Sequence, residues 1–114
     1  MIEHYQEGSY VKIKGAQYYN DLKIIDGQVK GRWWRSQGHR LQIEDIFDVL
    51  AAKPEIFVIG TGYAGHMRVP DEVRSAIEHK NIGVITADTA QAVETFNRLY
   101  AAGKDVAGAF HLTC

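Results

Sequence analysis

The fold is decided by the stretch Ile56-Phe57-Val58-Ile59-Gly60-Thr61-Gly62-Tyr63-Ala64-Gly65. Four consecutive apolar residues predict a short buried strand, and the glycines after them allow the backbone to turn sharply. The glycine spacing G-x-G-x-x-G is also the fingerprint of dinucleotide-binding sites, in which a helix begins inside the motif and meets the pyrophosphate. The residues that follow decide between these two interpretations.

The helix after the glycines begins too late for a dinucleotide site. The residues His66 to Val69 separate the last glycine from Pro70, where the next helix is expected to begin. Asp88 follows the next strand, where a ribose ligand would be expected, but Asp88–Gln91 also has the pattern of a helix cap. We therefore interpret the glycines as a strand-end loop and expect no cofactor.

A second interpretation of this loop is a site for a small anion. Successive backbone amides, the nearby helix start and the Arg68 side chain would suit a carboxylate or a phosphate. Two basic side chains of the segment 32–40, Arg35 and His39, are added to these candidate anion ligands. The candidate ligand-binding residues are Gly60, Thr61, Gly62, Tyr63, Arg68, Arg35 and His39.

Helices and strands alternate along most of the chain. Strands are predicted around 10–14, 22–25, 28–30, 56–59, 83–86 and 106–112, with an Asp26-Gly27 hairpin turn. Helices are predicted from the apolar positions Ile43, Ile46, Phe47 and Leu50, from Pro70 onward, and from Asp88 to Gly103. This order predicts one α/β domain over residues 1–114, with three layers: a central mixed β-sheet flanked by helices, and an N-terminal β-hairpin or meander.

Composition limits the class of protein. The 114 residues carry a net charge of −1, so the whole molecule has no electrostatic preference for nucleic acid or acidic lipid. The single cysteine, Cys114, allows no disulfide within the chain, which fits a reducing compartment. No signal-peptide pattern or membrane-length apolar run is present, so we expect a cytoplasmic protein without membrane contact.

The segment Arg32-Trp33-Trp34-Arg35 combines aromatic and basic residues. On an extended backbone Trp33 and Arg35 share one face and Arg32 and Trp34 the other, so one tryptophan can enter the core. Stacked aromatics beside arginine suit single-stranded nucleic acid. A cation–π brace that holds the loop on the domain fits the net charge better, so we expect no nucleic-acid partner.

The histidines and the cysteine lack the spacing of a zinc motif. If the last strand runs to the end of the sequence, His111 and Cys114 point to opposite faces, which disfavours a cysteine–histidine nucleophilic pair. No other nucleophile, base and orienting group stand in a recognisable order. We expect no catalytic residues and no metal.

The order of motifs resembles a known family. The matching segments are Ile56–Gly62, Val69-Pro70, Gly83-Val84, Asp88–Val93, Asn97, Leu99 and Gly103–Cys114. The pattern is similar to the small single-domain family that includes the adipogenesis-associated domain protein and a mitochondrial assembly factor for respiratory complex I. The adipogenesis-associated branch is the more similar, through Trp34-Arg35, Gly38-His39, Phe110-His111 and Thr113-Cys114. The resemblance implies a three-layer fold around a mixed sheet and supplies no enzymatic mechanism.

These observations favour a non-enzymatic interaction or accessory protein with an unidentified protein partner, as a monomer or homodimer. One alternative is a binding protein or weak enzyme for a small anionic metabolite at residues 60–65. Another is a single-stranded nucleic-acid binder that uses residues 32–40.

Overall fold

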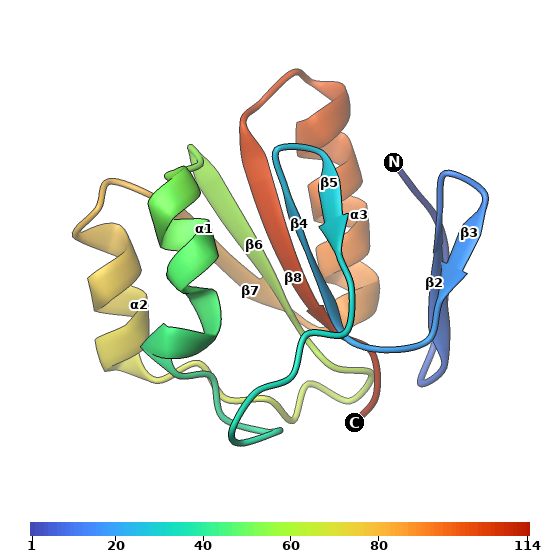
Figure 1. Cartoon of the computed structure of the whole chain (residues 1–114), viewed down its shortest axis with the longest axis horizontal. Coiled ribbons are helices and arrows are strands. Elements are labelled where there is room, and N and C mark those ends of the chain that lie inside the picture. The colour runs from blue at the N-terminus through green and yellow to red at the C-terminus, as the bar shows by residue number, and fades with distance from the viewer.

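Eight strands form two separate sheets in the computed structural model, which describes all residues 1–114 (Figure 1). The strands are β1 (Ile2–Gln6), β2 (Tyr10–Ile13), β3 (Ala16–Tyr18), β4 (Leu22–Ile25), β5 (Gln28–Lys30), β6 (Ile56–Thr61), β7 (Gly83–Ala87) and β8 (Val106–His111). The helices are the 3-10 turn η1 (Ile43–Ile46), α1 (Phe47–Ala52), α2 (Asp71–Glu78) and α3 (Thr89–Ala101).

The larger sheet is mixed, as the sequence predicts. Its strand order is β5-β4-β8-β6-β7. The predicted strand β6 lies inside the sheet and pairs in parallel with both β7 and β8, whereas β4 pairs antiparallel with β8 and with β5. The β4–β5 hairpin turns at Asp26-Gly27, both with positive φ, as the Asp-Gly pair predicts.

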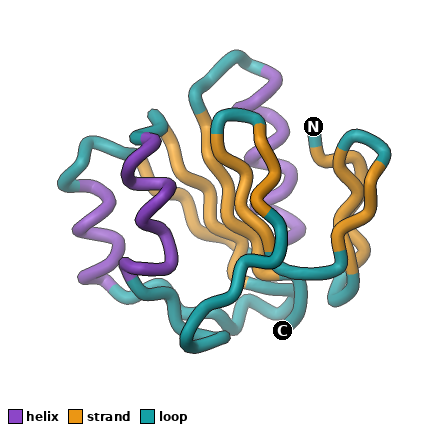
Figure 2. Tube along the Cα trace, viewed as in Figure 1, coloured by secondary structure: helices purple, strands orange, loops and turns teal.

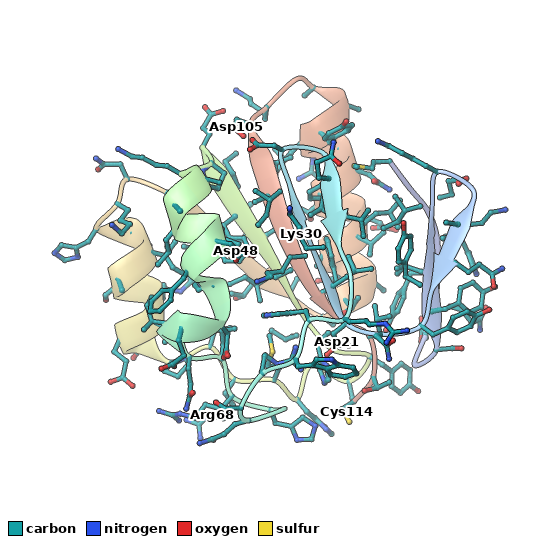
Figure 3. The ribbon with its side chains drawn as sticks, viewed as in Figure 1. Asp21, Lys30, Asp48, Arg68, Asp105 and Cys114 are labelled. Atoms are coloured by element: carbon teal, nitrogen blue, oxygen red, sulfur yellow. The ribbon has the colours of Figure 1, made fainter.

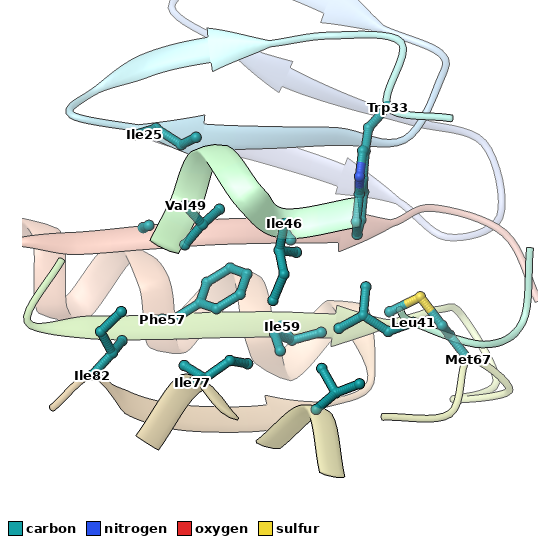
Figure 4. Packing of buried hydrophobic residues seen from close by; sticks show 13 residues of the cluster. Ile25, Trp33, Leu41, Ile46, Val49, Phe57, Ile59, Met67, Ile77 and Ile82 are labelled. Atoms are coloured by element: carbon teal, nitrogen blue, oxygen red, sulfur yellow. The ribbon is translucent and has the colours of Figure 1, made fainter. Parts of the chain in front are cut away.

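Helices cover both faces of this sheet. Alternate residues of β6 point in opposite directions, so Phe57 and Ile59 join a cluster under α1 and α2 (Figure 4), and Val58 joins a cluster under α3. The second cluster also contains Val11 and Ile13 from the small β1-β2-β3 sheet. This small sheet lies beside α3 (Figures 1 and 2), so it covers the core and does not extend the central sheet.

Two strands and one helix face differ from the sequence prediction. Strands β1 and β3 were not predicted individually, because their side chains are mostly exposed and show no buried apolar run. Phe47, placed on the apolar helix face, is 61% exposed, and Val49 is fully buried instead. The cause is the 3-10 turn over Ile43–Ile46, which takes fewer residues per turn than an α-helix and rotates the following face.

The loops after β6 and β8 gather at one edge of the molecule (Figure 2). Parallel strands bring their carboxyl ends to the same edge of a sheet, which is where ligands usually bind in α/β folds. No helix has the length and apolar character needed to cross a membrane. The candidate site is therefore sought among these loops.

Candidate functional site

The amides of the glycine loop mostly bond within the protein. Gly62 has a φ of +113°, and its amide donates to the Thr89 hydroxyl at 2.9 Å. The amides of Gly65 and Met67 donate to the carbonyls of Gly62 and Thr61. Those of Tyr63 and Ala64 have no hydrogen bond within the chain, so the loop keeps only two adjacent amides free for a ligand.

Gly62 is needed because the end of the chain passes against it. A Cβ at this position would lie 2.5 Å from the Thr113 carbonyl oxygen and 2.9 Å from the Cys114 carbonyl carbon. The amide of His66 donates to Cys114 O at 3.2 Å and so also holds this segment. The glycine loop is thus a cradle for residues 113 and 114.

A buried charge network lies beside this cradle. Asp21 Oδ2 accepts from Arg35 Nη2 at 2.8 Å and from His111 Nδ1 at 2.6 Å. Its other carboxylate oxygen accepts from the Leu112 amide at 2.8 Å. The Arg35 and His111 side chains are only 3% and 6% exposed. Asp21 therefore ties the segment after β3 to the end of β8.

These partners set the ionisation of Asp21. Burial raises the pKa of the carboxyl, but hydrogen bonds from His111, the Leu112 amide and Arg35 outweigh burial and lower the pKa below its usual value of 3.8. The unfolded chain then binds a proton more tightly than the folded one. The resulting stabilisation is complete above the usual carboxyl pKa and is lost as the pH falls through the lowered value.

The predicted cation–π brace is present. Trp33 is buried, and the Arg35 guanidinium carbon lies 4.5 Å from its ring centroid. The ring also faces Lys23 Nζ at 5.6 Å, and its indole nitrogen donates to the Asp45 carbonyl at 3.0 Å. Trp34 points the other way and is 71% exposed, as expected of an extended backbone.

The last strand does not run to the end of the sequence, so the condition under which His111 and Cys114 would point to opposite faces is not met. Strand β8 ends at His111, and the backbone leaves the extended conformation to reach a φ of +51° at Cys114. Donor atoms of His39, His111 and Cys114 all lie within 4.8 Å of one another. Residues without metal-motif spacing in the sequence are therefore adjacent in space, although no metal is part of the structure.

Some of the predicted ligand-binding residues are buried or bonded within the protein, and the others are exposed to solvent. Gly60 is buried under Thr89 and Phe110, and Thr61 donates its hydroxyl to the Ala87 carbonyl. Arg35 is neutralised by Asp21. The exposed members are Tyr63, Arg68 and His39, and the Arg68 amide donates to the His39 carbonyl at 2.8 Å. Figure 3 shows Arg68, Asp21 and Cys114 toward the same lower edge.

We call the segments 33–40, 61–68 and 111–114 together the loop edge. Five hollows mark the protein surface, with volumes of about 300–460 Å³, but none is lined by residues 60–69 or 111–114. Of the loop edge, only Arg40 lines a hollow, which continues over Leu41–Glu44 and α2; residues 61–68 and 111–114 line none.

Sequence reasoning missed Asp21 and did not assign a role to His111. A histidine in an otherwise apolar, buried strand is a signal, because a buried polar side chain needs a partner. The sequence does not indicate which residue is the partner, because Asp21 is 90 residues away from His111 along the chain.

Comparisons with known proteins agree with this description of the fold. A conserved hypothetical protein of Pyrococcus horikoshii aligns with a TM-score of 0.85 and 24% identity over 100% of this chain and 99% of its own. A Bartonella henselae protein described as an outer membrane protein gives a TM-score of 0.84 and 29% identity, over 99% and 94%. A Mth938-like domain of Bordetella pertussis gives 0.66 and 22%, over 98% and 85%.

A family model also matches almost the whole chain. It covers residues 2–111 and is described as a protein of unknown function. The match includes the glycine loop, Asp21, Arg35 and His111. The chain belongs to the DUF498/DUF598 family of proteins of unknown function.

Proposed function

We propose that this protein is a non-enzymatic accessory protein of the cytoplasm that binds a partner protein through the loop edge. The observation that carries the proposal is the lack of any hollow over residues 61–68 and 111–114 of this edge. Small-molecule sites are concave and bury most of their ligand, whereas protein partners bind to flatter surfaces. The single cysteine, which forms no disulfide, supports the reducing compartment.

Trp34 is the best anchor for such a partner. Its ring is 71% exposed, while its neighbours Trp33 and Arg35 are buried and fixed to the core. An exposed aromatic on a rigid backbone loses little conformational entropy on binding, and tryptophan is enriched among interface residues that dominate affinity. With Trp33 buried and Arg35 paired, the segment offers little of the alternating aromatic and basic surface that single-stranded nucleic acid requires.

The residues that carry the family resemblance also favour the loop edge as the binding surface. Trp34-Arg35, Gly38-His39, Phe110-His111 and Thr113-Cys114 are distant in sequence, but Arg35, His39, His111 and Cys114 come together in space. We propose that the likeness to the adipogenesis-associated branch reflects a common role of this edge in binding.

Partner capture tests the proposal. Tagged protein is expected to retain a reproducible partner from native lysate, and Trp34→Ala to lose it with an unchanged melting temperature. Tyr19→Ala is the matched control, because Tyr19 is 63% exposed on the N-terminal side of the molecule. No reproducible partner, or equal loss with both variants, would contradict the proposal.

A second candidate is a small-anion site at residues 60–65. The free amides of Tyr63 and Ala64, with the exposed Arg68 nearby in sequence, favour it. An anion at 100 times its dissociation constant is expected to stabilise the protein by about 2.7 kcal/mol.

A thermal-shift screen of carboxylates, phosphates and nucleotides measures this stabilisation. Arg68→Ala and Gly62→Val are expected to abolish the shift, and Arg74→Ala, from α2, to preserve it. If no anion raises the melting temperature, or if Arg68→Ala leaves the shift unchanged, the second candidate is wrong.

A further inference from the structure

Three potential metal ligands converge at the loop edge. One donor atom from each of His39, His111 and Cys114 lies within 4.8 Å of the other two. The two imidazole centroids are 5.8 Å apart and their planes are inclined by 65°. His39 and Cys114 are exposed, so each has room to turn, whereas His111 is fixed in the core.

The His111 ring presents a lone pair with no partner. Its Nδ1 lies 2.6 Å from the Asp21 carboxylate and 3.1 Å from Arg35 Nη2. A carboxylate only accepts, so at this distance the proton belongs on Nδ1, and Nε2 of the neutral ring is an acceptor. Nε2 is buried and has no hydrogen-bond partner.

The Nε2 side of the ring lies near the backbone of Cys114. The Cδ2 atom, which is bonded to Nε2, faces the Gly62 cradle: a Cβ on Gly62 would lie 2.9 Å from it. The same Cβ would lie 2.9 Å from the Cys114 carbonyl carbon. Thus the Nε2 side of the ring and Cys114 meet at one glycine.

Each donor is also held by the backbone. The loop that carries His39 is fixed through the Gly38 carbonyl, which accepts from Arg35 Nη2 at 2.9 Å, and through the Arg68 amide, which donates to the His39 carbonyl. Cys114 is held by the His66 amide. A fixed backbone with mobile donor side chains is suited to closing around an ion.

We propose that His39, His111 through Nε2, and Cys114 through Sγ bind a Zn²⁺-type transition-metal ion. Two imidazoles and a thiolate are ligands preferred by Zn²⁺ and Co²⁺ and unsuited to Ca²⁺ or Mg²⁺. The Asp21–His111 pair supplies the carboxylate–histidine arrangement that orients metal-binding histidines. Three protein ligands leave a fourth position for water or for a donor from another molecule.

Closing the site requires small side-chain movements. Metal–nitrogen and metal–sulfur bonds of about 2.1 and 2.3 Å place tetrahedral donors roughly 3.5 Å apart. In the structure the donor atoms lie within 4.8 Å of one another. Rotation of the exposed His39 and Cys114 side chains toward His111 shortens these distances to the roughly 3.5 Å that a tetrahedral site needs. On binding, the Cys114 thiol loses its proton to solvent, and the thiolate forms the metal–sulfur bond.

Titration of the full, reduced chain with Co²⁺ tests the site. We expect one Co²⁺ per protein, with tetrahedral d–d bands and a thiolate-to-cobalt charge-transfer band, both removed by added Zn²⁺. Cys114→Ser is expected to abolish the charge-transfer band. Asp21→Asn is expected to weaken Zn²⁺ binding by about 10–100-fold, as loss of an orienting partner does in other metal sites.

Control variants separate this site from adventitious binding. His79→Ala removes an exposed histidine at the end of α2 and is expected to leave Co²⁺ binding unchanged. His39→Ala is expected to lower the affinity more than tenfold, because it removes one of three ligands. Binding without a charge-transfer band, or equal loss in His79→Ala and His39→Ala, would overturn the proposal.

Alkylation distinguishes a metal ligand from a catalytic thiol. Zn²⁺ is expected to protect Cys114 from iodoacetamide in the native protein, and His39→Ala to remove the protection. Fast alkylation that Zn²⁺ does not slow would overturn the metal site and point to a nucleophilic cysteine activated by His111. These results do not depend on partner capture, so the two proposals fail separately.

Discussion

Replacing Asp21 with alanine is expected to lower the free energy of unfolding by about 3–5 kcal/mol at neutral pH. The substitution leaves the Arg35 guanidinium buried without its carboxylate, and two of its nitrogens already lack hydrogen-bond partners. It also removes the acceptor of the Leu112 amide and of His111. Urea unfolding followed by far-UV circular dichroism measures the change.

Two comparisons make this result specific. Asp105→Ala removes an exposed carboxylate at the opposite end of the molecule (Figure 3) and is expected to change stability by less than about 0.5 kcal/mol. In the Asp21→Ala background, Arg35→Met is expected to restore stability, because it removes the unpaired charge and keeps apolar contact with Trp33. Equal losses for Asp21→Ala and Asp105→Ala would contradict the importance of the buried network.

Phe110→Ala is expected to lower the free energy of unfolding of the otherwise unchanged protein by about 3–5 kcal/mol. The Phe110 ring is fully buried and meets Phe96 of α3 edge-to-face, with centroids 5.7 Å apart. It also covers Gly60 on β6 and Gly108 on its own strand. Removing it leaves a cavity between α3 and the centre of the sheet, which thermal and urea unfolding would both detect.

The glycine under this ring provides an internal check. A Cβ at Gly108 would lie 2.5 Å from Phe110 Cε2, so Gly108→Ala is expected to destabilise the wild-type protein. In the Phe110→Ala background the same substitution is expected to cost much less, since only Phe96 Cδ1, 3.0 Å from the added Cβ, still lies close to it. Phe47→Ala, at a residue 61% exposed, is the matched control with a small effect. An equal cost of Gly108→Ala in both backgrounds would contradict this account of the packing.

The sequence predicted the parts of the fold that depend on local chemistry. The apolar run at 56–59 is the buried strand β6, the Asp-Gly pair is the β4–β5 turn, and Asp88 caps α3 by accepting from the Gln91 amide at 3.1 Å. Each depends on residues close together in the chain. The alternation of strands and helices predicted the parallel part of the sheet, and the N-terminal hairpin predicted its mixed character.

The candidate site was less predictable because it is assembled from distant segments. The placement of Cys114 depends on the strand ending at His111, and no residue between them signals that end. Asp21 looks like an ordinary loop acid until β4 pairs with β8 and brings it beside His111. Strands β1 and β3 were missed because they lack a buried pattern of their own. Strand β1 is stabilised by pairing with β2 and by packing on α3, and β3 by pairing with β2.

The position of β8 also has a consequence for biosynthesis. The strand order β5-β4-β8-β6-β7 places the last-synthesised strand at the centre of the sheet, between two strands made much earlier. During translation β4 and β6 therefore each keep one unpaired backbone edge until β8 emerges from the ribosome. Pairing across most of the chain slows folding and exposes such edges to aggregation. Nascent chains stalled before β8 are expected to depend on chaperones, and completion of the sheet becomes a late, single event.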